Sequence, residues 1–73
     1  MYDRNELIEY CKRHPLYKFI TKDKDGTIVA FENEPICNED LEIWQSGNGA
    51  FGSFKGSNIG DIDWKESLIR VYQ

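Results

Sequence analysis

The sequence contains few of the residue types that metal sites, membrane spans and exported proteins require. It has two cysteines and one histidine in 73 residues, and these three side chains alone do not make a four-ligand zinc site. No apolar run approaches the ~20 residues that span a membrane. The segment MYDRNELIEY carries acids where a signal peptide has its apolar run. We therefore expect a cytoplasmic protein with reduced thiols, no cofactor, no metal and no membrane contact.

Positive charge is missing from the middle of the chain. No Lys or Arg stands between Asp25 and Phe54, and the net charge is −4. The acids that accumulate in this segment are Glu32, Glu34, Glu39, Asp40 and Glu42. Binding to duplex nucleic acid rests on Lys and Arg neutralising phosphates, so we expect none. Such an acidic face would instead attract a basic protein surface.

The length of the chain bounds both its organisation and its chemistry. We expect a single domain over residues 1–73. A chain of this size buries only about 60% of the surface that it exposes when unfolded. That leaves no room for a packed core together with a deep substrate pocket, and no nucleophile–base pair or metal set can be assembled. We therefore expect a protein that is not an enzyme.

The first half of the chain predicts a helix followed by a β-hairpin. Asp3 is a good N-cap and Glu6 follows at capping-box spacing, so the helix covers residues 3–14 and ends before Pro15. Residues 17–22 and 27–32 have strand composition. The pair Asp25-Gly26 between them favours a tight turn.

The second half predicts shorter elements. The sequence predicts a loop over residues 36–40 and a third strand over residues 41–45, with Glu42 and Trp44 on one face. A glycine-rich loop follows, then a helical turn over residues 63–67 and a last strand over residues 68–72. The fold class is therefore α+β, with one N-terminal helix packed on a three- to four-stranded antiparallel sheet.

The segment TKDKDGTIVAFE, residues 21–32, matches part of the calcium-binding EF-hand loop. Asp23, Asp25 and Glu32 fall at ligand positions, but Thr21 stands where the first Asp is needed. An EF-hand loop is also flanked by helices, whereas TIVAF favours a strand. We therefore interpret the segment as a hairpin and not as a metal site.

The segment GNGAFG, residues 47–52, fits the pattern G-x-G-x-x-G, and it resembles the phosphate-covering loop of protein kinases. Glycines let backbone N–H groups approach a phosphate closely. The catalytic loop and metal-binding aspartates of a kinase are absent, so turn formation explains the glycines more simply. A nucleotide-binding loop stays open as the alternative, with the residues Gly47, Gly49, Gly52 and Lys55.

The remaining polar candidates have structural explanations. His14 falls in the last turn of the helix, where the dipole favours a cation. Cys11 lies on the apolar stripe and is expected in the core, whereas Cys37 is expected in a more exposed loop. Asp63 is placed to cap the turn that follows it.

Four aromatic residues are the strongest candidates for recognition: Trp44, Phe51, Phe54 and Trp64. A domain this small can leave some of these rings at its surface, and exposed rings beside acids are typical of protein-binding hot spots. The competing interpretation places all four in the core. The residues that we expect to contact a partner are Glu39, Asp40, Glu42, Trp44 and Phe51.

The order of these segments resembles a loose group of short accessory proteins encoded by phages and prophages. The resemblance rests on the hairpin YKFITKDKDGTIVAFENEP, the strand LEIWQ and the ending DIDWKESLIRV, and it covers most of residues 17–71. It implies an infected or lysogenic bacterial host, and action by binding a host protein or by sequestering a nucleotide signal. The group supplies no catalytic residue.

Three hypotheses follow. The first is a protein that binds and occludes a host protein, such as a component of a defence system, through an acidic and aromatic face. The second is a small-nucleotide-binding module that uses the loop from Gly47 to Gly60. The third is a virion or assembly component, and a homo-oligomer stays open under all three.

Overall fold

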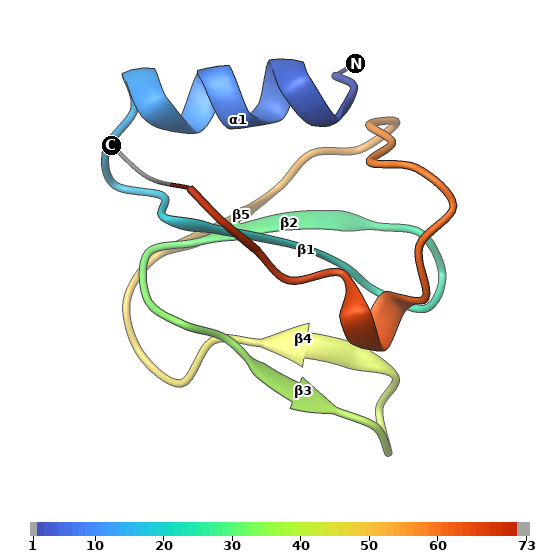
Figure 1. Cartoon of the computed structure of the whole chain (residues 1–73). Helices are drawn as coiled ribbons and strands as arrows, with labels where there is room; N and C mark the ends of the chain where they lie inside the picture. Colours follow the sequence, from blue (N-terminus) through green and yellow to red (C-terminus); the bar gives the residue numbers. More distant parts are fainter. Residues whose placement is uncertain (1, 72–73) are drawn as a thin grey trace.

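The computed structural model of the chain, described here for residues 2–71, has one helix and six short strands. Their bounds are α1 Arg4–Arg13, β1 Phe19–Lys22, β2 Ile28–Phe31, β3 Ile36–Asn38, β4 Ile43–Gln45, β5 Phe51–Ser53, the 3-10 helix η1 Trp64–Glu66, and β6 Ile69–Arg70. Four strands form an antiparallel sheet in the order β5-β2-β1-β6, while β3 and β4 pair separately. The helix crosses one side of the large sheet and the β3–β4 hairpin lies on the other (Figure 1). The predicted α+β fold is confirmed.

The predicted start of the helix is confirmed by its capping box. The Asp3 carboxylate accepts from the Glu6 main-chain N–H at 2.9 Å, and the Glu6 carboxylate accepts from the Asp3 N–H at 3.1 Å. These bonds satisfy main-chain donors that have no partner within the first turn. The helix ends at Arg13, just before the residue that Pro15 restricts.

The hairpin between β1 and β2 is also confirmed, so residues 21–32 have the strand flanks that an EF-hand lacks. Gly26 adopts a φ of +94°, which a side chain would strain. Asp25 accepts from the Thr27 N–H at 2.9 Å. Its carboxylate therefore stabilises the turn, as an aspartate at this position commonly does.

The two faces of the large sheet bury different residues. Alternation along β1 and β2 points Ile20, Ile28 and Ala30 toward α1. There they form a core with Leu7, Cys11, Ile59 and Val71. Val29, Phe31 and Thr21 lie on the opposite face, here called the outer face, and all three are buried.

Four predicted elements need correction. Ile36–Asn38 is a strand and not a loop, because it pairs with Ile43–Gln45 in the separate two-stranded sheet. The predicted strand over residues 41–45 begins only at Ile43, since Glu42 has a φ of +60° that breaks extended geometry. The glycine-rich segment contains β5, which pairs with β2. The last strand ends at Arg70, and Tyr72 lies outside the described residues.

The predicted helical turn is confirmed as η1, which Ser67 ties to β1. Asp63 caps it by accepting from the Lys65 N–H at 3.0 Å. The buried Ser67 hydroxyl accepts from the Lys22 N–H at 2.8 Å and donates to the Trp64 carbonyl at 2.7 Å. One side chain thus joins segments 45 residues apart.

Candidate functional site

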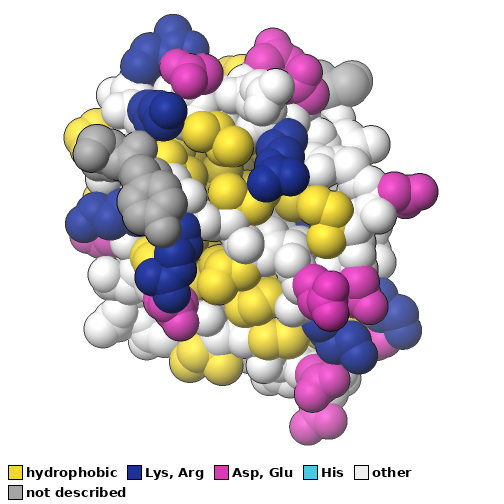
Figure 2. Space-filling view, viewed as in Figure 1, with side chains coloured by type: hydrophobic (Ala, Val, Ile, Leu, Met, Phe, Trp, Pro, Cys, Tyr) yellow, Lys and Arg dark blue, Asp and Glu magenta, His cyan; other side chains and the backbone are white. Residues whose placement is uncertain are grey.

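An apolar groove of about 350 Å³ lies between the outer face of the sheet and the β3–β4 hairpin. Its walls come from both sheets, and five of the nine lining residues are apolar. Figure 2 shows hydrophobic side chains beneath α1 and again over the hairpin, with charged side chains around them. The residues that line the groove are Asp23, Val29, Phe31, Ile43, Trp44, Gln45, Ser46, Phe51 and Ser53.

The sheet side of the groove is built by neighbouring strands. Val29 stands opposite Ser53 and Phe31 opposite Phe51 in the β2–β5 register, so all four side chains share the outer face. The rings of Phe31 and Phe51 are 6.2 Å apart between centroids. Phe31 is buried, whereas Phe51 is 64% exposed. Phe51 is therefore the open rim of the groove.

The hairpin side of the groove is held by hydrogen bonds to β1 and η1. The Trp44 main-chain N–H donates to Asp23 Oδ1 at 2.8 Å, and its indole Nε1–H donates to the Trp64 carbonyl at 2.8 Å. The Lys24 N–H donates to the Glu42 carbonyl at 3.2 Å. These contacts fix Trp44 in place, half-buried against the groove.

Asp23 is the one ionisable group among the lining residues, and it is only 8% exposed. Burial raises the pKa of this carboxyl above its ordinary value, although the Trp44 N–H favours the charged form and opposes the shift. Within residues 2–71, no group donates a hydrogen bond to its second oxygen, Oδ2. Oδ2 is nevertheless not a fully buried atom without a partner, so the Asp23 carboxylate keeps a small contact with solvent in the groove.

The main chain of β5 is open on one side. Glu32 N–H donates to the Ala50 carbonyl at 2.9 Å, and Phe54 N–H donates to the Ile28 carbonyl at 2.8 Å. Successive residues of an antiparallel strand direct their N–H and C=O groups to opposite sides. Ala50, Gly52 and Phe54 therefore bond to β2, while the main-chain groups of Phe51 and Ser53 face away from the sheet, beside the groove.

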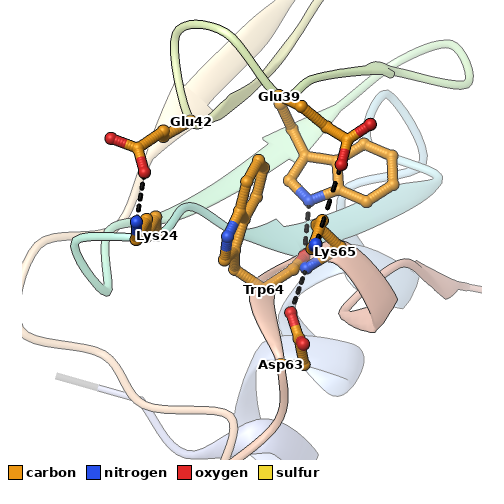
Figure 3. Close-up of polar contacts among 7 residues, drawn as sticks. Lys24, Glu39, Glu42, Asp63, Trp64 and Lys65 are labelled. Atoms are coloured by element: carbon orange, nitrogen blue, oxygen red, sulfur yellow. Dashed lines mark hydrogen bonds and ion pairs between the residues drawn. The ribbon is translucent and has the colours of Figure 1, made fainter.

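The predicted partner-binding residues do not form one cluster. Trp44 and Phe51 share the groove, but Glu39 and Asp40 border a separate polar hollow and Glu42 borders a third. Two of the acids are paired: Glu39 with Lys65 at 3.6 Å, and Glu42 with Lys24 (Figure 3). The acidic residues thus lie at the margin of the hairpin, partly neutralised and exposed.

Sequence reasoning missed seven of the nine lining residues: Asp23, Val29, Phe31, Ile43, Gln45, Ser46 and Ser53. From the sequence, Asp23 is a candidate only as a metal ligand. The available signal is alternation, because Asp23, just after β1, continues the face of Thr21, and Val29 and Phe31 share a face of β2. That pattern predicts two buried faces, but it does not predict which segment covers the second one.

The glycines of the nucleotide-binding alternative have packing roles. A Cβ on Gly49, which has a φ of +84°, would lie 2.5 Å from Asn33 Nδ2 and 2.8 Å from Glu32 Oε1. The same Glu32 oxygen accepts from the Ala50 N–H at 3.0 Å, so this main-chain donor of the loop is already bonded within the protein. Lys55 is exposed beyond β5. The glycines are therefore explained by packing without a ligand.

The predicted aromatic set is divided between the two faces. Phe54 lies on the helix side, where its ring is 5.3 Å from that of Tyr10. Trp64 is half-buried beside Trp44, and its side chain is less exposed than that of Phe51. Cys11 is fully buried as predicted. Cys37 is half-buried in β3, and exposed His14 stacks on Tyr10 at 4.2 Å.

Comparison with known proteins yields no match to a family model, to a curated protein or to a solved structure. Within the described part of the chain, no helix has the length and apolar character to cross a membrane. Residues 2–71 also contain no group of three or more His, Cys, Asp or Glu placed to hold a metal ion.

Proposed function

We propose that the protein is a small non-enzymatic binding protein that attaches to and occludes another protein through the groove and its acidic margin. The observation that carries this proposal is the exposed ring of Phe51 at the rim of an apolar groove. Large aromatic side chains beside a well-packed pocket supply most of the energy of many protein interfaces. In the setting that the sequence resemblance implies, the partner is a protein of a phage's bacterial host, and the complex forms in the cytoplasm.

The negative charge of the protein is complementary to a basic surface on the partner. The net charge is −4, and Asp40 carries no ion pair with any other residue of 2–71. Acids around an apolar centre steer a basic partner and exclude an acidic one. Glu39, Asp40 and Glu42 would thus affect the association rate more than the affinity.

The test is affinity capture from host lysate with the wild type and two variants. Phe51→Ser removes the rim ring, and Leu16→Ser removes an exposed apolar side chain that does not line the groove. We expect one stoichiometric protein to be retained by the wild type and by Leu16→Ser, and to be reduced at least tenfold with Phe51→Ser. Equal capture by all three folded proteins, or capture of nothing, would contradict the proposal.

A further inference from the structure

We infer that the partner inserts one arginine side chain into the groove, where the guanidinium pairs with the Asp23 carboxylate. This inference rests on the proposed function and names the chemical group of the partner that the groove recognises. It is carried by the size of the groove, by the uncompensated charge of Asp23 and by the aromatic rings that line the same space.

The groove has the size of a site for one side chain and not for a whole secondary-structure element. Its volume is about 350 Å³, at the lower end of the range of about 300–1,000 Å³ that pockets for small ligands occupy. One turn of an α-helix with its side chains is about 5.4 Å long and about 10–12 Å across, so it already exceeds this volume. Phe51 is 64% exposed at the rim, so the groove is open to a single incoming side chain.

The carboxylate of Asp23 selects a cation. Its residue is only 8% exposed, Oδ1 accepts a main-chain N–H, and Oδ2 has no donor within residues 2–71. The neighbouring lysines are engaged elsewhere, since Lys22 Nζ donates to a main-chain carbonyl at 3.1 Å and Lys24 pairs with Glu42. No Lys or Arg of the described chain forms an ion pair with Asp23. A desolvated carboxylate is costly unless a cation compensates it, so a cationic group from another molecule is the complement of this site.

The lining of the groove favours arginine over lysine. Phe31, Trp44 and Phe51 contribute three aromatic side chains to the walls. A guanidinium is planar and weakly hydrated and stacks on aromatic faces, whereas an ammonium is a compact, strongly hydrated charge. The guanidinium also has five N–H donors. Ser46 and Ser53 add hydroxyl groups to the lining that can accept some of them.

The charge of the chain argues against a second copy as the source of the arginine. The net charge is −4, and Glu39, Asp40 and Glu42 border the β3–β4 hairpin. Two such molecules repel each other, whereas a basic partner is attracted to the same margin. The occupant that satisfies the groove and its margin is therefore an arginine of a different, basic protein.

The experiment titrates the 15N-labelled protein with four capped amino acids and follows its amide signals. The probes are the Nα-acetyl amides of arginine, lysine, citrulline and glutamate, of which citrulline has the shape of arginine without its charge. We expect saturable shifts of the Trp44 and Phe51 signals with arginine, at the millimolar affinity that a ligand with so few atoms reaches. Arginine should bind at least fivefold more tightly than citrulline and at least twofold more tightly than lysine, and glutamate should not bind.

Two variants test whether Asp23 holds the cation. Asp23→Asn keeps an acceptor for the Trp44 N–H and should reduce the preference for arginine over citrulline to about onefold. Asp61→Asn makes the same charge change at an exposed site outside the groove and should leave the preference intact. The indole N–H signal of Trp44, which is bonded to the Trp64 carbonyl, reports whether the hairpin stays docked. If it undocks in Asp23→Asn, the comparison of arginine with citrulline on the wild type decides.

Several results would overturn this inference. They are the absence of a saturable shift with arginine, equal affinity for arginine and citrulline or for arginine and lysine, and shifts confined to the acidic margin. Trp44 shifts that depend on protein concentration without any probe would assign the groove to a second copy and also overturn it.

Affinity capture separates this inference from the proposed function. Capture that is lost with Phe51→Ser but retained with Asp23→Asn rejects the arginine and leaves the proposed function standing. Capture of no protein by the wild type rejects the proposed function. A preference for arginine that persists in that case would assign the groove to a free guanidinium compound and not to a protein partner.

Discussion

Asp23 and Trp44 are joined by a hydrogen bond of 2.8 Å between a buried carboxylate oxygen and a main-chain N–H. Asp23 directly follows the last residue of β1, and Trp44 is the central residue of β4. This bond holds the β3–β4 hairpin against the large sheet and so creates the groove. The stability of the groove and its electrostatics therefore depend on the same carboxylate.

The stability of the protein should respond to pH through Asp23. Burial raises the pKa of this carboxyl in the folded state above its unfolded value. The folded state therefore binds its proton at higher pH than the unfolded state does, and this group lowers stability at neutral pH. The unfavourable contribution of Asp23 to the free energy of unfolding should diminish as the pH falls from above the folded-state pKa toward the unfolded-state pKa.

Urea unfolding of wild type and Asp23→Asn at pH 7, 5.5 and 4 measures this effect. The free energy of unfolding of the wild type should increase relative to that of the variant as the pH is lowered. A difference that stays constant, or that changes in the opposite direction, would show that burial does not govern this carboxyl.

Thr21→Val should stabilise the fold. The Thr21 hydroxyl is fully buried on the outer face, and within residues 2–71 it finds no hydrogen-bond partner. Replacing a buried unsatisfied hydroxyl by a methyl group of the same shape removes a desolvation cost of about 1–3 kcal/mol. We expect a gain of about 1 kcal/mol by chemical denaturation. The matched variant Thr21→Ser keeps the hydroxyl and loses a methyl, so it should lose about 1 kcal/mol; a stabilised Ser variant would refute this explanation.

Ser67→Ala should destabilise the fold by about 1–3 kcal/mol, because it removes a buried hydroxyl and leaves the Lys22 N–H at the end of β1 without its acceptor. Ser53→Ala removes an exposed hydroxyl and should change stability by less than about 0.5 kcal/mol. Thermal unfolding of both variants provides the measurement. Similar melting temperatures for the two would mean that the link between η1 and β1 is energetically unimportant.

The two thiols should differ in reactivity. Burial raises the pKa of Cys11 to about 11, so almost no thiolate is present at pH 8. Cys37 is half-buried in β3, and burial and then Glu39 raise its pKa as well. An aromatic disulfide reagent should modify Cys37 first and Cys11 only as fast as the protein opens. Cys37→Ser should abolish the first phase, and a first phase that persists would place the reactive thiol at Cys11.

Local patterns predicted the elements whose causes lie within a few residues. The capping box of Asp3 and Glu6, the Asp25-Gly26 turn and the Asp63 cap all depend on contacts within three residues of sequence. The composition of β3 and β5 did not predict strands, and β5 contains a glycine, which weakens a strand. Their pairing with β4 and β2 supplies the extended geometry that their own composition does not favour.

The sequence by itself determined an α+β fold with one capped helix, a central hairpin and an acidic middle segment, since these follow from short-range hydrogen bonds, periodicity and composition. Only the tertiary structure decided that Asp23 faces an apolar groove, that Phe51 is exposed while Phe54 is not, and that β5 has an open edge. The physical reason is that burial and strand pairing depend on segments distant in the chain, such as β4 over the end of β1. No local pattern records which of two apolar faces a distant hairpin covers.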